Sequence, residues 1–419
     1  MKRAILAVSL CLGISSTPAF ALDWSVNSSL SETVELSNNQ FLRSMLAGGT
    51  LGSYSTITAN AEARTPTSRF IADGDITYQK YWGPGTEGIP QTEFRQDGVR
   101  ARYETWGKDR TDLSYAEVAF RESSTALAIL SDLGVATTAQ GFIDTSTIRG
   151  GIERNLTPLD FVTLSARSTY TNYDPPGGGT PLTDSSALAT WRHRLSSNVA
   201  LTASSELEWL NFNNSSNTRI MILRDMAGVD ATLSPVLSFR GTAGVGYVKA
   251  DQNATATTSL VPFTTTAASS ASVADLITDM LLTYRMLKNT TVTLYGNQTI
   301  GPSVIGSLTK LTTIGAGLTH IINSRSSLSF AASASRQVTT SSLDFYSGSV
   351  TYNYELAREW NSQLTYRHLH RTASTGGTTG AIFDPISGVP IVASVGAPAD
   401  SDSIMLVVTR NFTVLPPGN

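Results

Sequence analysis

Apolar and polar residues alternate along much of this chain, and the segments that keep the alternation run for about ten residues. Between Val199 and Trp209, one face carries Val, Leu, Ala and Trp, while the other carries Thr, Ser and Glu. A period of two residues is typical of β-strands with two different faces. Strands of soluble sandwiches usually have about five or six residues, whereas a tilted strand needs about ten to cross a bilayer. The pattern therefore predicts an all-β fold, a transmembrane antiparallel up-and-down barrel.

Short and long connections alternate between these segments. Tight turns are expected at 234–235 and 288–289, and long loops at 124–144, 251–271 and 372–401. Outer-membrane barrels have short periplasmic turns and longer extracellular loops. Nine long and eight short connections predict 18 strands, with both termini in the periplasm. The alternative is 16 strands, if those around 219–232 or 345–355 are misread.

The first residues predict an export signal. Lys2 and Arg3 precede an apolar stretch of eleven residues, and Ala19-Phe20-Ala21 supplies the small-x-small pattern of a cleavage site. Such a stretch is too short to span a bilayer as a helix, which needs about 20 residues. We predict cleavage after Ala21 and localisation in a bacterial outer membrane. The predicted domains are a signal peptide (1–21), an outer-membrane barrel (22–412) and a short periplasmic tail (413–419).

Cysteine and charge exclude several classes of function. Cys11 is the only cysteine and lies inside the predicted signal, where the preceding Leu10 does not fit a lipoprotein cleavage site. A processed chain without cysteine excludes disulfides and thiol catalysis. Loss of Lys2 and Arg3 leaves 28 of the 30 basic residues against 33 acidic ones. This slightly acidic balance gives no reason to expect a nucleic-acid partner.

The tryptophans predict an interfacial aromatic girdle. Each lies within a few residues of an expected strand end, as the two membrane interfaces require. The girdle candidates are Trp24, Trp106, Trp191 and Trp360 at periplasmic ends, and Trp82 and Trp209 at outer ends.

The polar faces of the expected strands predict the lining of a lumen. An 18-stranded barrel is wide enough for an aqueous interior, and acidic and basic groups facing each other across it produce a transverse field that favours polar solutes. An equally simple interpretation is that these charges are solvated by water inside a wide barrel and have no role in selectivity. The lumen-lining candidates are Arg167, Arg192, Glu206, Glu208, Arg240, Arg367 and Arg371. Aromatic residues are expected to be few on this face.

No pattern in the sequence indicates catalysis, a metal site or a cofactor. The chain has no G-x-S-x-G, no H-E-x-x-H and no P-loop motif. His368 and His370 share one strand face, but without an accompanying carboxylate we interpret them as an interfacial pair. The acids of 400–402 are interpreted as solvated rather than as a calcium site. Leu127, Leu130 and Leu133 have helical spacing and can line a short helix that plugs the lumen or rests on the rim.

Several segments resemble the outer-membrane β-barrel porins associated with exopolysaccharide and exosortase (PEP-CTERM) gene clusters. The opening run 29–39 is similar to their first strand, and the phrases at 155–158, 194–197 and 233–235 resemble their periplasmic turns. The ending, 352–371 and 403–416, also looks like theirs. The resemblance implies a barrel, and as partners it implies exopolysaccharide export proteins.

Three functions stay open at this point. The first is a porin-like channel for passive passage of small hydrophilic solutes, and the second is an accessory barrel in exopolysaccharide export. The third is a non-transporting structural or surface-interaction barrel. In each case the expected partners are outer-membrane lipid and lipopolysaccharide, with the barrel-assembly machinery during insertion. Nothing in the sequence marks a homo-oligomer contact.

Overall fold

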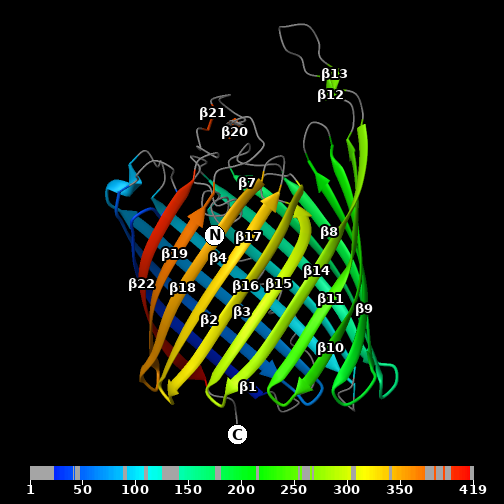
Figure 1. The fold of residues 1–419 in the computed structure, drawn as a ribbon, viewed down its shortest axis with the longest axis horizontal. Helices are drawn as coiled ribbons and strands as arrows, with labels where there is room; N and C mark the ends of the chain where they lie inside the picture. The colour runs from blue at the N-terminus through cyan, green and yellow to red at the C-terminus, as the bar shows by residue number, and fades with distance from the viewer. Residues whose placement is uncertain are drawn as a thin grey trace.

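The computed structural model is a closed barrel of 18 antiparallel strands, each paired with its neighbours in chain order (Figure 1). It describes residues 23–40, 42, 48–87, 92–107, 112–124, 141–174, 181–213, 217–252, 255–256, 265–266, 269–302, 308–338, 342–372, 382–383, 390–391 and 398–415. The predicted strand number of 18 is therefore confirmed. The two strands whose reading was least certain are both present, as β10 and β18.

The barrel strands have 12 to 19 residues. They are β1 (Asp23–Ser37), β2 (Thr50–Arg64), β3 (Ser68–Trp82), β4 (Glu93–Trp106), β5 (Leu113–Ser124), β6 (Phe142–Asn155), β7 (Asp160–Asp174), β8 (Leu182–Arg194), β9 (Val199–Phe212), β10 (Arg219–Ser234), β11 (Leu237–Gln252), β14 (Ser269–Leu287), β15 (Thr290–Pro302), β16 (Leu308–Asn323), β17 (Ser326–Val338), β18 (Ser342–Ala357), β19 (Trp360–Arg371) and β22 (Ala399–Leu415). Outside the barrel wall lie the short 3-10 helix η2 (Pro84–Thr86) and two small hairpins, β12 (Thr255–Ala256) with β13 (Thr265–Thr266) and β20 (Ile382–Phe383) with β21 (Pro390–Ile391).

The first and last strands close the barrel. β1 pairs with β22 on one side and with β2 on the other, so neither strand leaves an open sheet edge. Leu36 lies opposite Ile404 and Val34 opposite Leu406 in this closing pair. β22 runs on to Leu415, three residues past the end expected for the last strand. The predicted signal peptide and the Leu-rich segment 125–140 lie outside the described residues.

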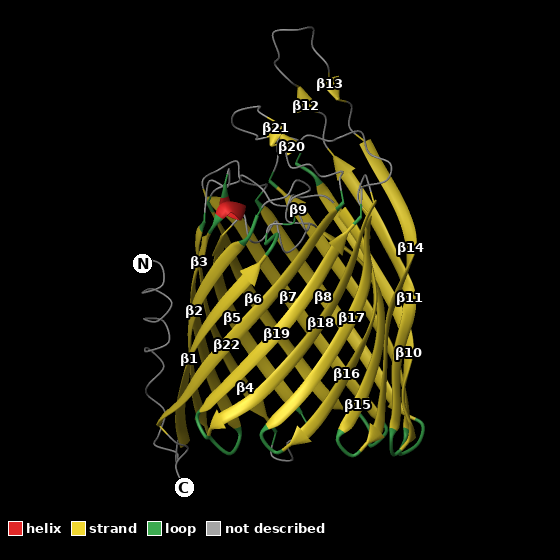
Figure 2. Cartoon of the chain, turned by 60° about the vertical axis from the view of Figure 1, so that its left-hand side comes forward, coloured by secondary structure: helices red, strands yellow, loops and turns green. Residues whose placement is uncertain are grey.

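The two ends of the barrel differ in their connections. At the short-turn end, β10 and β11 are separated by two residues, as are β14 and β15 (Figure 2). The chain enters β1 at this end and leaves β22 there as well. Most connections at the opposite, long-connection end are longer, including those before β6 and β22, although only three residues join β17 and β18 there. This arrangement agrees with the predicted alternation of short and long connections.

The two faces of the sheet have opposite character. Exposed apolar side chains from neighbouring strands lie opposite one another on one face, as in the pairs Ile57 with Ile76 and Val118 with Ile148. The other face brings together side chains from strands that are not adjacent, such as Arg167 of β7 and Glu208 of β9. Only the concave face of a closed barrel makes side chains converge in this way. The apolar face is therefore the outside, and it forms a continuous hydrophobic surface larger than a water-exposed domain tolerates.

No helix in the described ranges has the length and hydropathy needed to cross a membrane.

Candidate functional site

The inner face carries all seven side chains expected to line a lumen. Alternation from the paired positions places Arg167, Arg192, Glu206, Glu208, Arg240, Arg367 and Arg371 on the concave side of their strands. They do not form one site. The structure divides most of them among three clusters of contacts.

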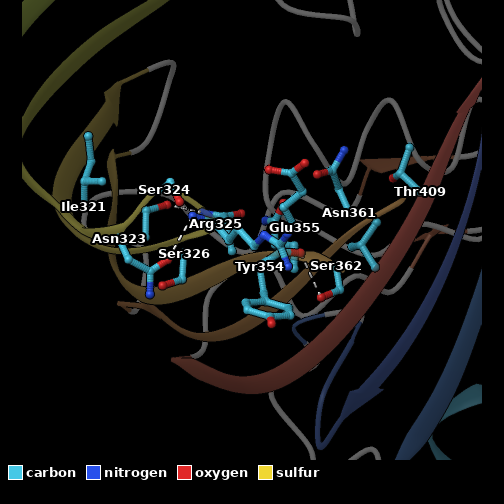
Figure 3. A pocket seen from close by; sticks show the side chains of 14 residues that line it. Ile321, Asn323, Ser324, Arg325, Ser326, Tyr354, Glu355, Asn361, Ser362 and Thr409 are labelled. Atoms are coloured by element: carbon cyan, nitrogen blue, oxygen red, sulfur yellow. Dashed lines mark hydrogen bonds between the residues drawn. The ribbon is translucent and has the colours of Figure 1, made fainter. Parts of the chain in front are cut away.

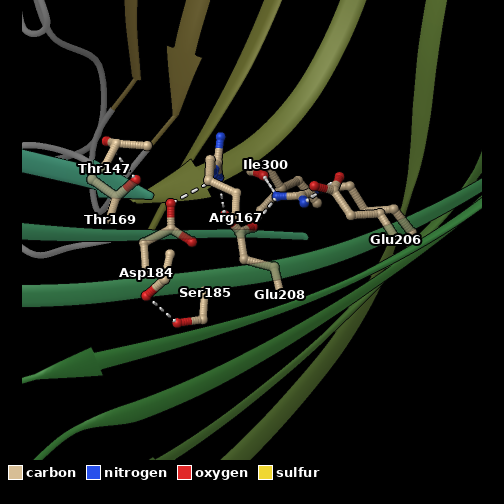
Figure 4. A network of polar contacts seen from close by, with 10 residues as sticks. Thr147, Arg167, Thr169, Asp184, Ser185, Glu206, Glu208 and Ile300 are labelled. Carbon is tan, nitrogen blue, oxygen red and sulfur yellow. Dashed lines mark hydrogen bonds and ion pairs between the residues drawn. The ribbon is translucent and has the colours of Figure 1, made fainter. Parts of the chain in front are cut away.

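The densest cluster joins β7, β8, β9 and β10 (Figure 4). Arg167 donates to Asp184 at 2.8 Å and lies 3.4 Å from Glu208. Arg224 donates to Glu206 at 3.0 Å and to Glu208 at 2.6 Å. The Glu208 side chain is only 5% exposed, so two guanidinium groups compensate a carboxylate that has largely lost its water.

Sequence reasoning missed Arg224 and Asp184, the other half of this cluster. Arg224 follows Ile220 and Ile222 on the same face of β10, and those isoleucines made that face look apolar. Asp184 lies near the start of β8, next to a loop. The available signal was the repeat of acids at 206 and 208, because two carboxylates on one strand face need a basic partner on a neighbouring strand.

A second cluster lies nearer the short-turn end. Arg192 of β8 donates to Asp230 of β10 at 3.0 Å, and Arg240 of β11 reaches the same carboxylate at 3.4 Å. The Arg240 side chain is the more exposed of the two bases. One acid therefore holds two bases, which leaves a local excess of positive charge on the inner face.

The third cluster surrounds Glu35 of β1. Arg367 donates to Glu35 at 3.3 Å, and the hydroxyl of Tyr54 donates to the same carboxylate. Tyr54 also shares a hydrogen bond of 2.9 Å with Tyr81, whose ring meets that of Phe94 edge to face. Arg371 lies on the same strand face as Arg367 and is buried.

Aromatic residues are more frequent on the inner face than the sequence indicated. Tyr54, Tyr81, Phe94 and Tyr115 all point inward, and Arg102 lies 4.4 Å from the centre of the Tyr115 ring. The expectation of few inner aromatic residues was wrong. Each of these residues lies alone among polar side chains on its strand face, so no aromatic pattern marked that face in the sequence. Tyr81 and Phe94 are, however, only 4% and 2% exposed.

Charged side chains are also frequent among the inward side chains of β2 to β11, here called the charged wall. Besides the first two clusters, this wall contains a ladder in which Arg69 contacts Glu62 and Glu104, and Arg102 contacts Glu104 and Glu117. Acids and bases alternate around this wall, and most of them are held at ion-pair distance.

The inward side chains of β15 to β18, here called the neutral wall, are different. In the described strand residues from Thr291 to Asn353, this face carries no Asp, Glu, Lys or Arg. Hydroxyl groups pair across the strands instead, as in Ser333 with Ser347 at 2.6 Å and Thr319 with Ser329 at 3.3 Å. This wall was not expected, because Ser, Thr and Ala are common on both faces of β16 to β18 and mark no lining by themselves.

A recess of about 390 Å³ lies at the short-turn end of the neutral wall (Figure 3). Hydroxyl and amide side chains dominate its lining, and Asn353 donates to Ser327 at 3.4 Å within it. Arg325 and Glu355 are the charged residues at its rim. Its polar lining suits water and neutral polar solutes rather than apolar ligands.

An apolar cluster lies on the inner face near the long-connection end, where a polar lining was expected. The cluster is formed by Leu210, Phe212, Ile220, Ile222, Val248, Ile277 and Ile300. Its members come from β9, β10, β11, β14 and β15, and all are buried. A lumen filled with water at this level would leave them exposed, so protein covers this part of the inner face.

Five of the six predicted girdle tryptophans lie on the outer face near a strand end. These are Trp24, Trp82, Trp191, Trp209 and Trp360. Trp106 is the exception. It is the last residue of β4, shares the inner strand face with Arg102 and Glu104, and donates to the carbonyl of Pro66 at 3.1 Å. The prediction counted distance from the strand end and not the parity of the position.

The outward histidine pair of β19 has acidic neighbours after all. His368 lies 2.8 Å from Asp402 and His370 lies 2.6 Å from Asp400, both across the β19–β22 pair. The premise that no carboxylate accompanies them was therefore wrong, because pairing of distant strands brings the acids of 400–402 beside them. Within the described residues, no group of three or more His, Cys, Asp or Glu is arranged to hold a metal ion.

Comparison with known proteins supports the fold. No family model and no curated protein matches the chain. The FrpB iron transporter from Neisseria meningitidis (F5-1 variant) is 7% identical with a TM-score of 0.50, over 93% of this chain and 82% of that chain. The ferric-catecholate import receptor Fiu from E. coli K12, in its open form, is 9% identical with a TM-score of 0.48, over 92% and 81%. At this identity the likeness to FrpB shows the barrel fold alone. The resemblance to exopolysaccharide-associated porins stays a prediction.

Proposed function

We propose that this protein is an outer-membrane channel through which small hydrophilic solutes diffuse passively. The main support is the difference between the two faces of the barrel wall. An apolar outer surface that suits lipid encloses an inner surface rich in ion pairs and hydroxyl groups. A closed barrel satisfies every strand's backbone without water, which is the condition for a β-structure in a bilayer. Polar side chains inside it then serve water and polar solutes.

The proposal includes the location and the expected partners. An export signal cleaved after Ala21 would deliver the chain to the periplasm, where barrel-assembly machinery inserts it. Lipid and lipopolysaccharide would then surround the apolar face. The aromatic side chains of Trp24 and Trp360 at the short-turn end and of Trp82 at the other end suit the two interfaces.

The inner charges support selectivity among solutes. The charged wall holds both signs, while the neutral wall opposite holds neither, so the field inside the barrel is uneven across its width. A field of this kind orients polar solutes and slows apolar ones. Asp230 is shared between Arg192 and Arg240, and the Arg240 side chain stays 68% exposed and in contact with solution.

The test is single-channel conductance of the refolded, signal-free protein in planar bilayers, with ion selectivity from the reversal potential. Steady openings are expected, and Arg240→Gln should shift selectivity toward cations. The matched control is Arg336→Gln, because Arg336 is an outward arginine with similar exposure that is paired with Asp344. Silence from protein shown by circular dichroism to be folded β would overturn the proposal.

A second candidate is a barrel whose lumen is blocked. The buried apolar cluster at the long-connection end favours it, since that part of the interior is occupied by protein. Export of a polysaccharide, suggested by the family resemblance, is supported less. The inner rings of Tyr81 and Phe94 are packed against other groups and offer no open stacking surface to a sugar.

A further inference from the structure

The pairing between β14 and β15 stops before the two strands end. It runs from Leu287 opposite Thr290 to Thr278 opposite Gln298 and goes no further. β14 continues to pair with β11 as far as Ser269, and β15 continues to pair with β16 as far as Pro302. The same register, if continued, would place Leu276 opposite Ile300. The barrel wall therefore has a seam at its long-connection end, beside the part of β14 that rises above its neighbours (Figure 1).

Side chains replace the backbone hydrogen bonds that are missing at this seam. The amide of Gln298 donates to the carbonyl of Leu276 at 2.5 Å, and the N–H of Leu276 donates to Asp275 at 2.8 Å. The carbonyl of Ile300 accepts from Arg224 of β10 at 2.6 Å (Figure 4). Unmet backbone groups are costly away from water, so each substitute lowers the cost of leaving the seam unpaired.

Beyond the seam, β15 and β16 lie inside the barrel. Ile300 shares its strand parity with exposed residues such as Leu294, yet it is 7% exposed and packs in the inner apolar cluster. A Cβ built on the inward Gly246 would lie 3.6 Å from the Ile300 Cδ1 atom. Lys310, on the same face of β16 as the outward Ile314, bonds Asp275 at 2.5 Å, although β15 lies between their strands. The outer surface of this hairpin end thus covers the inner surface of β11 and β14.

We propose that this hairpin end, residues 299–302 and 308–311, is a flap that narrows the lumen and can swing back into the wall. In the tucked position seen here, it covers the apolar cluster and is latched by Arg224 and Lys310. In the alternative position, Leu276 pairs with Ile300, the seam closes and the passage widens. The inference rests on the proposed channel function, and it assigns to the flap the control of solute size.

Two engineered cysteines test the alternative position. The only natural cysteine lies in the predicted signal peptide, so the signal-free protein offers a clean background. In the closed-seam register, Leu276→Cys and Ile300→Cys become direct cross-strand neighbours, close enough for a disulfide. In the tucked position Leu276 is 55% exposed on the outer face, while Ile300 is on the inner side. A disulfide therefore reports that the flap has left the lumen.

The matched control pair is Leu282→Cys with Leu294→Cys. These residues lie opposite each other on the same two strands, in the part that is paired here. Each lies six residues from its counterpart in the test pair, so both pairs occupy the same kind of position in the hydrogen-bonding pattern. Their disulfide should form and leave conductance unchanged. The 276–300 disulfide should form on oxidation, raise single-channel conductance and admit solutes that the reduced protein excludes, and reduction should reverse both effects.

The measurements separate the two proposals. Failure of the 276–300 disulfide in protein whose control disulfide forms would overturn the flap, as would a disulfide that leaves conductance unchanged in a working channel. Disulfide yield is measured on gels, so this readout does not require an open channel. Silent channels in wild type and all variants would overturn the channel, and a 276–300 disulfide would still establish the flap.

A third variant tests the latch. Lys310→Ala removes the contact with Asp275 and should speed formation of the 276–300 disulfide. Lys249→Ala is the control, since Lys249 forms an ion pair with Asp251 on the outer face of β11, whereas the flap covers the inner face. Equal rates in the two variants would remove Lys310 from the latch.

Discussion

The charged wall and the neutral wall are built on the same backbone scaffold but stabilise it differently. On β7 to β10, ion pairs such as Arg224 with Glu208 fix long side chains at short distances. On β16 to β18, small hydroxyl side chains such as Ser333 and Ser347 bond directly across the strands. The charged wall supplies the electrostatic field, and the neutral wall supplies a neutral, adaptable polar surface. The proposed flap joins them, since its strands belong to the neutral wall and its latch, Arg224, to the charged wall.

The largest expected effect comes from breaking the charged wall at Glu208. Glu208→Ala leaves Arg167 and Arg224 without their shared carboxylate in a buried position. Loss of one member of a buried ion cluster costs about 3–5 kcal/mol. Denaturant unfolding in detergent micelles measures the free energy of unfolding. A loss near zero would show that the cluster is solvated and that the charged wall is not dry.

A matched pair of lysine substitutions tests which face of β17 meets lipid. Ala331 and Ala332 are adjacent, exposed and central in β17, and they point inward and outward respectively. Ala332→Lys should destabilise the folded barrel in lipid by about 2–4 kcal/mol, because its charge faces the hydrocarbon. Ala331→Lys should cost much less, since it faces the polar interior. Equal effects on unfolding in lipid vesicles would contradict the assignment of faces.

Ion selectivity tests the difference in electrostatic field between the charged wall and the neutral wall. Ala331→Asp adds an unpaired charge to the neutral wall, whereas Arg192→Gln leaves Asp230 still paired with Arg240. Both changes lower the charge of the interior by one, but the first should shift the reversal potential further toward cations. The measurement belongs near 0.1 M salt, where the screening length is about 10 Å. A larger shift for Arg192→Gln would mean that the paired wall dominates selectivity.

The smallest expected effect is the loss of one hydroxyl pair. Ser333→Ala removes the bond to Ser347 but leaves no buried charge behind. The expected cost is about 1 kcal/mol or less. Measuring the free energy of unfolding of both Ser333→Ala and Glu208→Ala compares the contribution of one contact in each wall. A cost as large as that of Glu208→Ala would remove the distinction between them.

The sequence alone predicted the strands, indicated 18 of them with 16 as the alternative, and predicted the face on which most side chains lie. These features are local: alternation with a period of two follows from the geometry of a single strand, and turn lengths follow from the residues between strands. For this reason parity alone predicted the inward placement of Arg167, Arg192, Glu206, Glu208, Arg240, Arg367 and Arg371. Trp106 was misplaced because distance from a strand end was used in place of parity.

Which side chains meet depends on the tertiary structure. Arg224 of β10 contacts Glu208 on the neighbouring strand β9 and Ile300 on β15. His368 contacts Asp402, which is 34 residues away in the sequence. Such contacts depend on the register between strands and on the curvature that makes inner side chains converge, and neither is written in a single strand's pattern. The seam between β14 and β15 is the clearest case. Parity places Ile300 on the outer face, and the end of strand pairing moves it inside.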